Sequence, residues 1–298
     1  SILQLCEERF YGTICLKKLL AWKNSPYRKP LILKGVRQVG KTWILKEFGR
    51  RCYENTAYFN FDENEEYKQF FETTKDVDRI LQNLMLASGQ KIVPEKTLII
   101  FDEVQKCPNA RQAIKYLVQD GRYDYIETGS LISIKQNTKG ITIPSEEEQI
   151  DMYPMDFEEF RWALGDNASI PLIKTFYEKR MHLGAAHRAK QRDLRLYMLV
   201  GGMPQAVNEY LNTNNLAKVD AVKRRIIKLY SDDFLKIDST GKLSRLFMAI
   251  PAQLSKKSTR FYTNSVVGEL EESTEAEMLI NLEDSKACLL YTSPSPRD

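Results

Sequence analysis

The feature that most constrains this chain is residues 35–42, Gly-Val-Arg-Gln-Val-Gly-Lys-Thr, which directly follow the apolar run 31–33. The segment fits the pattern G-x-x-x-x-G-K-[ST] between a strand and a helix, which is typical of a loop that holds nucleotide phosphates. Its glycines let backbone N–H groups turn inward around a β-phosphate, while the lysine reaches the β- and γ-phosphates and the threonine hydroxyl takes a Mg²⁺ position. The predicted nucleotide-binding residues of this loop are Gly35, Val36, Arg37, Gln38, Val39, Gly40, Lys41, Thr42 and Trp43.

A second apolar strand, residues 97–101, ends in the carboxylates Asp102 and Glu103. A continuous apolar run of this length is typical of a central parallel strand that is buried on both faces. At the strand's carboxyl end, Asp102 is predicted to hold Mg²⁺ through water, opposite Thr42. Glu103 is the candidate base that orients the attacking water. Under the alternative interpretation, the two acids only cap the helix that begins near Asn109.

A third strand, from Tyr123, closes on Thr128, Gly129 and Ser130. Either hydroxyl, Thr128 or Ser130, can contact the attacking water or the γ-phosphate if the strand ends at the same edge of the sheet. The alternative is that these small polar residues form an ordinary turn.

Strand and helix patterns alternate through this half of the chain. A second strand is predicted at 57–61, a helix with an apolar stripe at 77–85, and another helix with a stripe from Ala110 to Val118. A polar insertion at 135–148 precedes a fifth strand at 149–153. This alternation predicts an α/β fold with a parallel, doubly wound sheet.

The remaining chain is predicted to be helical. Asp156 and Glu159 have the spacing of a capping box, and helical patterns continue to Leu235. Gly201 and Gly202 end one of these helices, and Pro204 begins the next. A further helix is expected at 242–254, and Thr274 with Glu277 predicts a capping box for a last one.

These motifs, with segments 153–160 (YPMDFEEF), 201–206 (GGMPQA) and 250–255 (IPAQLS), resemble the bacterial and archaeal AAA-type ATPases that carry a C-terminal domain of unknown function. The resemblance runs from Trp22 to Ser285. It implies ATP binding and hydrolysis with Mg²⁺, an additional-strand P-loop sheet of order 5-1-4-3-2, a helical lid that moves with nucleotide state, and no established substrate. The domains expected are an N-terminal helical lead-in (1–30), the ATPase domain (31–155), the lid (156–241), a partial winged-helix-like domain (242–286) and a non-native tail (287–298).

Composition agrees with a chain outside the membrane. Of the 298 residues 43% are hydrophobic, and no run approaches the roughly 18 apolar residues that cross a bilayer. We therefore expect a cytoplasmic protein without a membrane partner. Five cysteines, an odd number without C-x-x-C spacing, indicate neither a disulfide framework nor a zinc site.

Partners are less constrained by the sequence. Residues 174–195 contain seven Lys or Arg against two acids, and a second basic cluster lies at 223–228. The C-terminal domain is a candidate for nucleic-acid or protein contact, and a homo-oligomer is possible. An arginine finger is expected, but spacing does not rank Arg111, Arg122 and Arg161.

Three functions remain open at this point: a Mg²⁺-dependent ATPase that switches its lid and C-terminal domain, a nucleotide-gated DNA-binding or scaffold protein with negligible hydrolysis, and a small-molecule kinase. The kinase leaves Glu103 without a task, because no water has to be activated.

Overall fold

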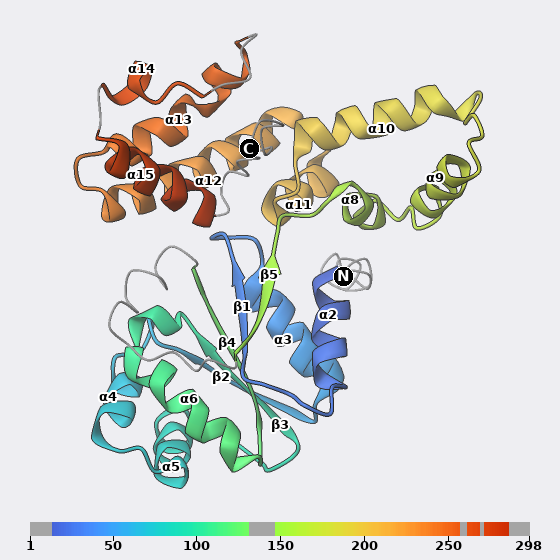
Figure 1. Ribbon diagram of the computed structural model, residues 1–298. Helices are drawn as coiled ribbons and strands as arrows, with labels where there is room; N and C mark the ends of the chain where they lie inside the picture. Colours follow the sequence, from blue (N-terminus) through green and yellow to red (C-terminus); the bar gives the residue numbers. More distant parts are fainter. Residues whose placement is uncertain (1–13, 131–146, 257–260, 269–270, 286–298) are drawn as a thin grey trace. The chain divides into compact units, whose positions relative to one another are not determined.

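The computed structural model describes residues 14–130, 147–256, 261–268 and 271–285 (Figure 1). Its contacts divide the chain into two units, residues 1–219 and 220–298. The division falls earlier than the predicted end of the lid at residue 241, and the domain boundaries stay a prediction.

The first unit is built on a parallel sheet of five strands. The strands are β1 (Leu31–Gly35), β2 (Asn55–Asn60), β3 (Thr97–Asp102), β4 (Asp124–Ser130) and β5 (Glu148–Met152). Their order is β2-β3-β4-β1-β5, with every neighbouring pair parallel. Read from the other edge this is 5-1-4-3-2, so the predicted fold class and strand order are confirmed.

Helices cover both faces of the sheet (Figure 1). On one face lie α2 (Ile14–Lys23) and α3 (Lys41–Cys52), and on the other α4 (Glu66–Thr73), α5 (Val77–Ser88) and α6 (Pro108–Asp120). All six residues of β3 are buried, because side chains that alternate along this central strand meet helices on either side. The carboxyl ends of the strands therefore form the edge where polar side chains can gather.

Two strands begin earlier than predicted. Strand β2 starts at Asn55, since residues 55–60 pair in register with 97–102 of β3. Strand β5 starts at Glu148 rather than at residue 149, because Glu148 already pairs with Leu31. Most of the predicted insertion, residues 135–146, lies outside the described residues, as does the tail 287–298.

Four helices follow β5 within the first unit: α8 (Phe157–Ala163), α9 (Ser169–Glu178), α10 (Ala186–Val200) and α11 (Pro204–Thr213). The predicted capping box at Asp156 and Glu159 is present, with both reciprocal hydrogen bonds formed. Helix α10 ends at Gly201 and α11 begins with Pro204, as predicted. We call this group, residues 157–213, the lid helices.

Helix α12 (Leu216–Ile237) runs from the first unit into the second, which also contains α13 (Lys242–Leu254), α14 (Asn264–Val267) and α15 (Glu272–Asp284). The predicted bounds of α13 are confirmed. The prediction of a capping box at Thr274 is wrong, because the Glu275 N–H already donates to the Glu271 carbonyl at 3.0 Å. Helix α15 thus begins before Thr274, which lies inside its first turn.

Candidate nucleotide site

The loop between β1 and α3 forms a cradle of backbone groups around the Lys41 ammonium. Lys41 Nζ donates to the carbonyl oxygens of Gly35 at 2.9 Å and Val36 at 3.1 Å. Left-handed backbone angles at Gln38 (φ 65°) and Gly40 (φ 102°) give the loop the alternating turns that form anion-binding concavities. Burial lowers the pKa of Lys41, while the nearby carboxylates Glu103 and Asp102 oppose that shift.

The glycine at the start of the loop is required by the neighbouring strand. A Cβ atom on Gly35 would lie 2.5 Å from the Met152 carbonyl oxygen of β5. No side chain fits there, so β5 holds the cradle against the sheet edge. This close approach of β5 is a physical reason for the first glycine of the motif, Gly35.

Two oxygen donors suited to Mg²⁺ meet beside the cradle. The Thr42 hydroxyl, at the start of α3, donates to Asp102 Oδ2 at 2.7 Å. Asp102 ends β3, is only 3% exposed and accepts the Glu103 backbone N–H at 2.9 Å through its other oxygen. A hydroxyl and a carboxylate beside a phosphate cradle fit a cation that takes a few protein oxygens and completes its shell with water and phosphate.

Glu103 has an unusual backbone for a residue with a side chain. Its φ of 55° and ψ of 43° place it in the left-handed region. Such strain persists only where the surroundings impose it, and it clusters at functional sites. The Glu103 carboxylate accepts a hydrogen bond from the Gln105 side chain, and burial together with Asp102 raises the pKa of Glu103. A raised pKa makes a carboxylate a better proton acceptor near neutral pH.

The capping interpretation of these two acids is wrong. Glu103 precedes the short 3₁₀ turn η1 (Val104–Lys106), and α6 begins only at Pro108, with Cys107 as its N-cap residue. In the part of the chain that the structure describes, neither carboxylate accepts a hydrogen bond from the first turn of α6.

Strand β4 places Thr128 in line with Asp102. The register pairs Phe101 with Glu127, so the next pair along the strands is Asp102 and Thr128. Thr128 is fully buried, and its hydroxyl has no hydrogen-bond partner among the described residues. Ser130 pairs with Gly35 through the backbone, at the start of the cradle. The roles of Thr128 and Ser130 toward phosphate stay predictions.

The residues at the rim of the loop differ in exposure. Val36 and Val39 are buried, Arg37 is exposed, and the Trp43 side chain is 42% exposed on α3. The valines hold the loop onto the core, whereas Arg37 and Trp43 are exposed, and their contact with nucleotide stays a prediction.

Sequence reasoning missed Tyr58. Its hydroxyl donates to Asp102 Oδ2 at 2.6 Å from the neighbouring strand β2. The register pairs Tyr58 with Ile100, and alternation along a strand puts both side chains on the same face as Asp102. Alternation along the strand gives the face of Tyr58, but the register with β3 is needed to identify Asp102 as its partner.

Two of the three arginine-finger candidates are held by acids away from the cradle. Arg111 is 1% exposed and forms ion pairs with Glu127 and Glu147. Arg122, at the opposite edge of the sheet, pairs with Asp120 and Asp78. Both guanidinium groups are already committed within this chain.

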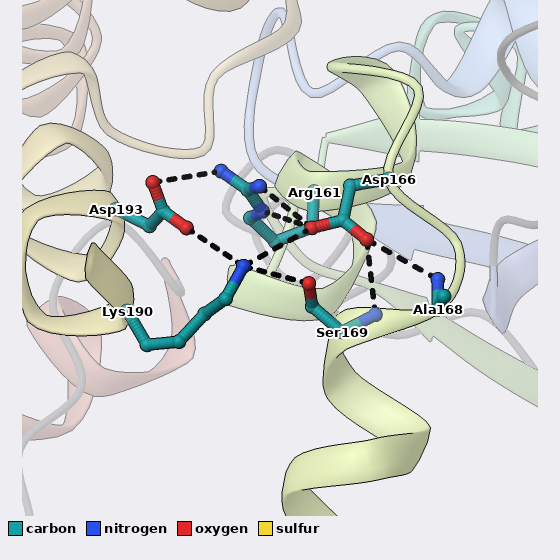
Figure 2. Close-up of polar contacts among 6 residues, drawn as sticks. All are labelled: Arg161, Asp166, Ala168, Ser169, Lys190 and Asp193. Atoms are coloured by element: carbon teal, nitrogen blue, oxygen red, sulfur yellow. Dashed lines mark hydrogen bonds and ion pairs between the residues drawn. The ribbon is translucent and has the colours of Figure 1, made fainter. Parts of the chain in front are cut away.

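The third candidate, Arg161, belongs to a closed network of charges that joins the lid helices (Figure 2). It pairs with Asp166 at 2.6 Å and Asp193 at 3.3 Å, and Lys190 pairs with the same two aspartates. Lys190 also donates to Ser169 Oγ at 2.7 Å. Because two cations and two anions satisfy one another, Arg161 serves to hold α8, the start of α9 and α10 together.

The comparison with protein families agrees with this geometry. Residues 27–161 match the AAA domain family, and residues 191–289 match a domain of unknown function. The chain thus contains a P-loop domain that matches the AAA family. Its AAA domain match contains the cradle, Asp102, Glu103 and the whole sheet, and the domain of unknown function begins within α10.

One curated protein is similar to part of this chain. A curated uncharacterized protein from Haemophilus influenzae is 26% identical over 172 residues, which are 55% of this chain and 40% of that protein. The chain thus spans about two fifths of the length of the curated relative it matches.

Solved structures of similar proteins include the ORC1 protein of Aeropyrum pernix in complex with DNA, at 11% identity and a TM-score of 0.36, covering 91% of this chain and 82% of that one. AMPPCP-bound DnaA from Aquifex aeolicus gives 12% identity and a TM-score of 0.36, covering 91% and 86%. Drosophila ORC bound to DNA gives 13% and 0.37, covering 97% and 86%. These scores are too low to support a statement about function.

Two findings concern only the described part of the chain. No helix there combines the length and the apolar character that a membrane span needs. Cys15, Cys52 and Cys107 are free thiols.

Proposed function

We propose that this AAA-type protein binds ATP with Mg²⁺ in the loop 35–42 and hydrolyses it. The observation that carries the proposal is the meeting of Thr42 and Asp102 at 2.7 Å beside the buried Lys41. Phosphoryl transfer to water depends chiefly on positioning and charge stabilisation, and these three side chains supply both.

Each side chain then has one task. Lys41 moves from the Gly35 and Val36 carbonyls to the β- and γ-phosphate oxygens when the nucleotide enters. Thr42 and Asp102 would hold Mg²⁺, and the bound ion would supply positive charge beside the phosphates. Glu103 accepts a proton from water as its oxygen bonds to the γ-phosphorus and the bond to the β-phosphate oxygen breaks. Thr128 or Ser130 contacts the γ-phosphate from β4.

We further propose that the lid helices follow the state of the cradle. Pro204, the first residue of α11, approaches the loop closely, since a Cβ on Gly40 would lie 3.7 Å from its ring. The backbone N–H of Met155, just after β5, donates to the Gly202 carbonyl at 2.8 Å. A change in the loop therefore meets the start of α11 directly.

The cradle is tested by Lys41→Ala, with Lys115→Ala as control because Lys115 is an exposed lysine of α6. Binding of a fluorescent ATP analogue with Mg²⁺ is measured for both variants. We expect Lys41→Ala to weaken binding by a factor of roughly 10 to 100, the loss of one or two charge-assisted hydrogen bonds. Equal binding by the two variants would contradict the assignment.

The second candidate, a nucleotide-gated DNA-binding protein with negligible hydrolysis, is favoured by one observation. Arg188, Arg192 and Arg195 are exposed on one face of α10 and form no ion pair with any described residue. This candidate predicts nucleotide-dependent retention of DNA that falls steeply with salt. Absence of retention, or retention independent of salt, would remove it.

A further inference from the structure

Asp102, the proposed metal-site carboxylate, is held from three directions. Oδ2 accepts the hydroxyls of Thr42 at 2.7 Å and Tyr58 at 2.6 Å, and Oδ1 accepts the Glu103 backbone N–H at 2.9 Å. Thr42 belongs to α3 and Tyr58 to β2. The carboxylate is therefore fixed between the helix that follows the cradle and the strand on the far side of β3.

Tyr58 is well placed to act as a donor to Asp102. Its phenol carries one O–H donor, and the 2.6 Å contact directs that donor at Asp102 Oδ2. The Lys46 ammonium lies 3.8 Å from the centre of the Tyr58 ring, a cation–π contact that adds to the packing of the ring. Ring and hydroxyl are thus restrained separately.

We propose that Tyr58 is a positioning residue of the Mg²⁺ site, which acts by orienting Asp102. The inference rests on the proposed function, because it assigns Tyr58 to the same metal site. Thr42 is itself a candidate metal ligand, so binding of the ion would alter its hydrogen bond to Asp102. Tyr58 supplies a hydroxyl from another strand, and that hydroxyl keeps Oδ2 oriented. Partners that orient a metal-binding residue contribute about 10- to 100-fold to metal affinity.

The test compares Tyr58→Phe with Tyr53→Phe. Tyr53 makes the same kind of bond, donating to Asp124 Oδ2 at 2.7 Å, but Asp124 begins β4 at the opposite edge of the sheet. Each variant is titrated with Mg²⁺ in the presence of fluorescent ADP, and Mn²⁺ binding is followed separately by electron paramagnetic resonance. Thermal unfolding of both variants shows how much stability each hydroxyl contributes.

We expect Tyr58→Phe to raise the midpoint Mg²⁺ concentration about 10-fold and to weaken Mn²⁺ binding similarly. ADP binding in excess chelator stays as in the wild type, and Tyr53→Phe leaves the midpoint unchanged. Equal midpoints for wild type and Tyr58→Phe, or an equal shift in both tyrosine variants, would overturn the inference.

A double variant separates positioning from general destabilisation. If Tyr58 acts through Asp102, adding Tyr58→Phe to Asp102→Asn shifts the midpoint no further, whereas additive shifts contradict the inference. A wild-type protein that binds no nucleotide with Mg²⁺ removes the proposed function, and this inference with it. A wild type that responds to Mg²⁺ while Tyr58→Phe responds at the same concentration removes the inference alone.

Discussion

At the scale of single residues, Arg111, Glu127 and Glu147 form a cluster of three buried charged side chains. Arg111 Nη1 donates to both glutamates, and all three side chains are at most 2% exposed. One cation and two carboxylates leave an excess negative charge in the interior. Burial, the largest influence, and the neighbouring Glu147 carboxylate raise the pKa of Glu127 to about 8 despite the opposing Arg111.

This pKa predicts a decline of stability with pH. An unfolded glutamate titrates near pH 4.3, so between about pH 4.3 and 8 the folded protein holds a proton that the unfolded chain releases. The stability that this proton contributes is fully present below the lower value and is lost as the pH rises toward the higher one. The free energy of unfolding therefore falls by about 1.4 kcal/mol per pH unit from this residue within that window.

Glu127→Gln removes this titration while its amide oxygen can still accept from Arg111. We expect the variant to gain stability relative to wild type as the pH rises from 5 to 8. Urea unfolding of both proteins at pH 5, 6.5 and 8 measures the difference, in which all other titrating groups cancel. A difference that does not change with pH would show that Glu127 is already ionised at pH 5.

At the scale of elements, the turn between α10 and α11 shows why the sequence has two consecutive glycines, Gly201 and Gly202. Gly201 has φ 82° and ψ −179°, a conformation open to glycine. Gly202 lies so close to Met155 that an added Cβ would be 2.1 Å from its carbonyl oxygen. The Tyr197 hydroxyl also donates to that oxygen, at 2.9 Å. The turn thus joins α10 and α11 to the segment that leaves β5.

Gly202→Ala should disturb this joint. The new methyl group meets backbone atoms, which cannot move aside as a flexible side chain can, so we expect a loss of about 1–3 kcal/mol of unfolding free energy. The control is Gly165→Ala. Gly165 has a φ of 83°, a left-handed value that Gly202 does not share, and nothing lies within 4 Å of the added carbon, so only backbone strain is introduced. Urea unfolding measures both variants.

Nucleotide-dependent protection of α10 and α11 from hydrogen exchange adds a functional readout for the same pair. It should be lost in Gly202→Ala and kept in Gly165→Ala. If Gly202→Ala is as stable as wild type and keeps the protection, Gly202 does not couple the lid helices to the cradle.

Elements were predictable where local patterns decide them, and less so where distant residues do. The capping box at Asp156 and the turn before Pro204 depend on neighbours in sequence. The start of β5 depends instead on pairing with β1, more than a hundred residues earlier, which no local pattern contains. The network around Arg161 likewise joins residues up to 32 positions apart (Figure 2).

At the scale of the whole molecule, the sheet brings three separate segments to one edge. The cradle, Asp102, Glu103 and Thr128 were predicted because each follows an apolar strand, and parallel strands end at the same edge. The strand order itself came from the family resemblance. Tyr58 lies within its strand, where a tyrosine normally indicates packing, so only the three-dimensional register identifies its partner.

The proposed function depends most directly on hydrolysis of ATP at this edge of the sheet. The decisive measurement is phosphate release from MgATP by the wild-type chain and by Glu103→Gln, with nucleotide binding followed on both. We predict that release falls by about 10² to 10⁴ in the variant while binding persists. Equal release by the two proteins would contradict Glu103 as the base, and binding without release in either would contradict hydrolysis by this chain.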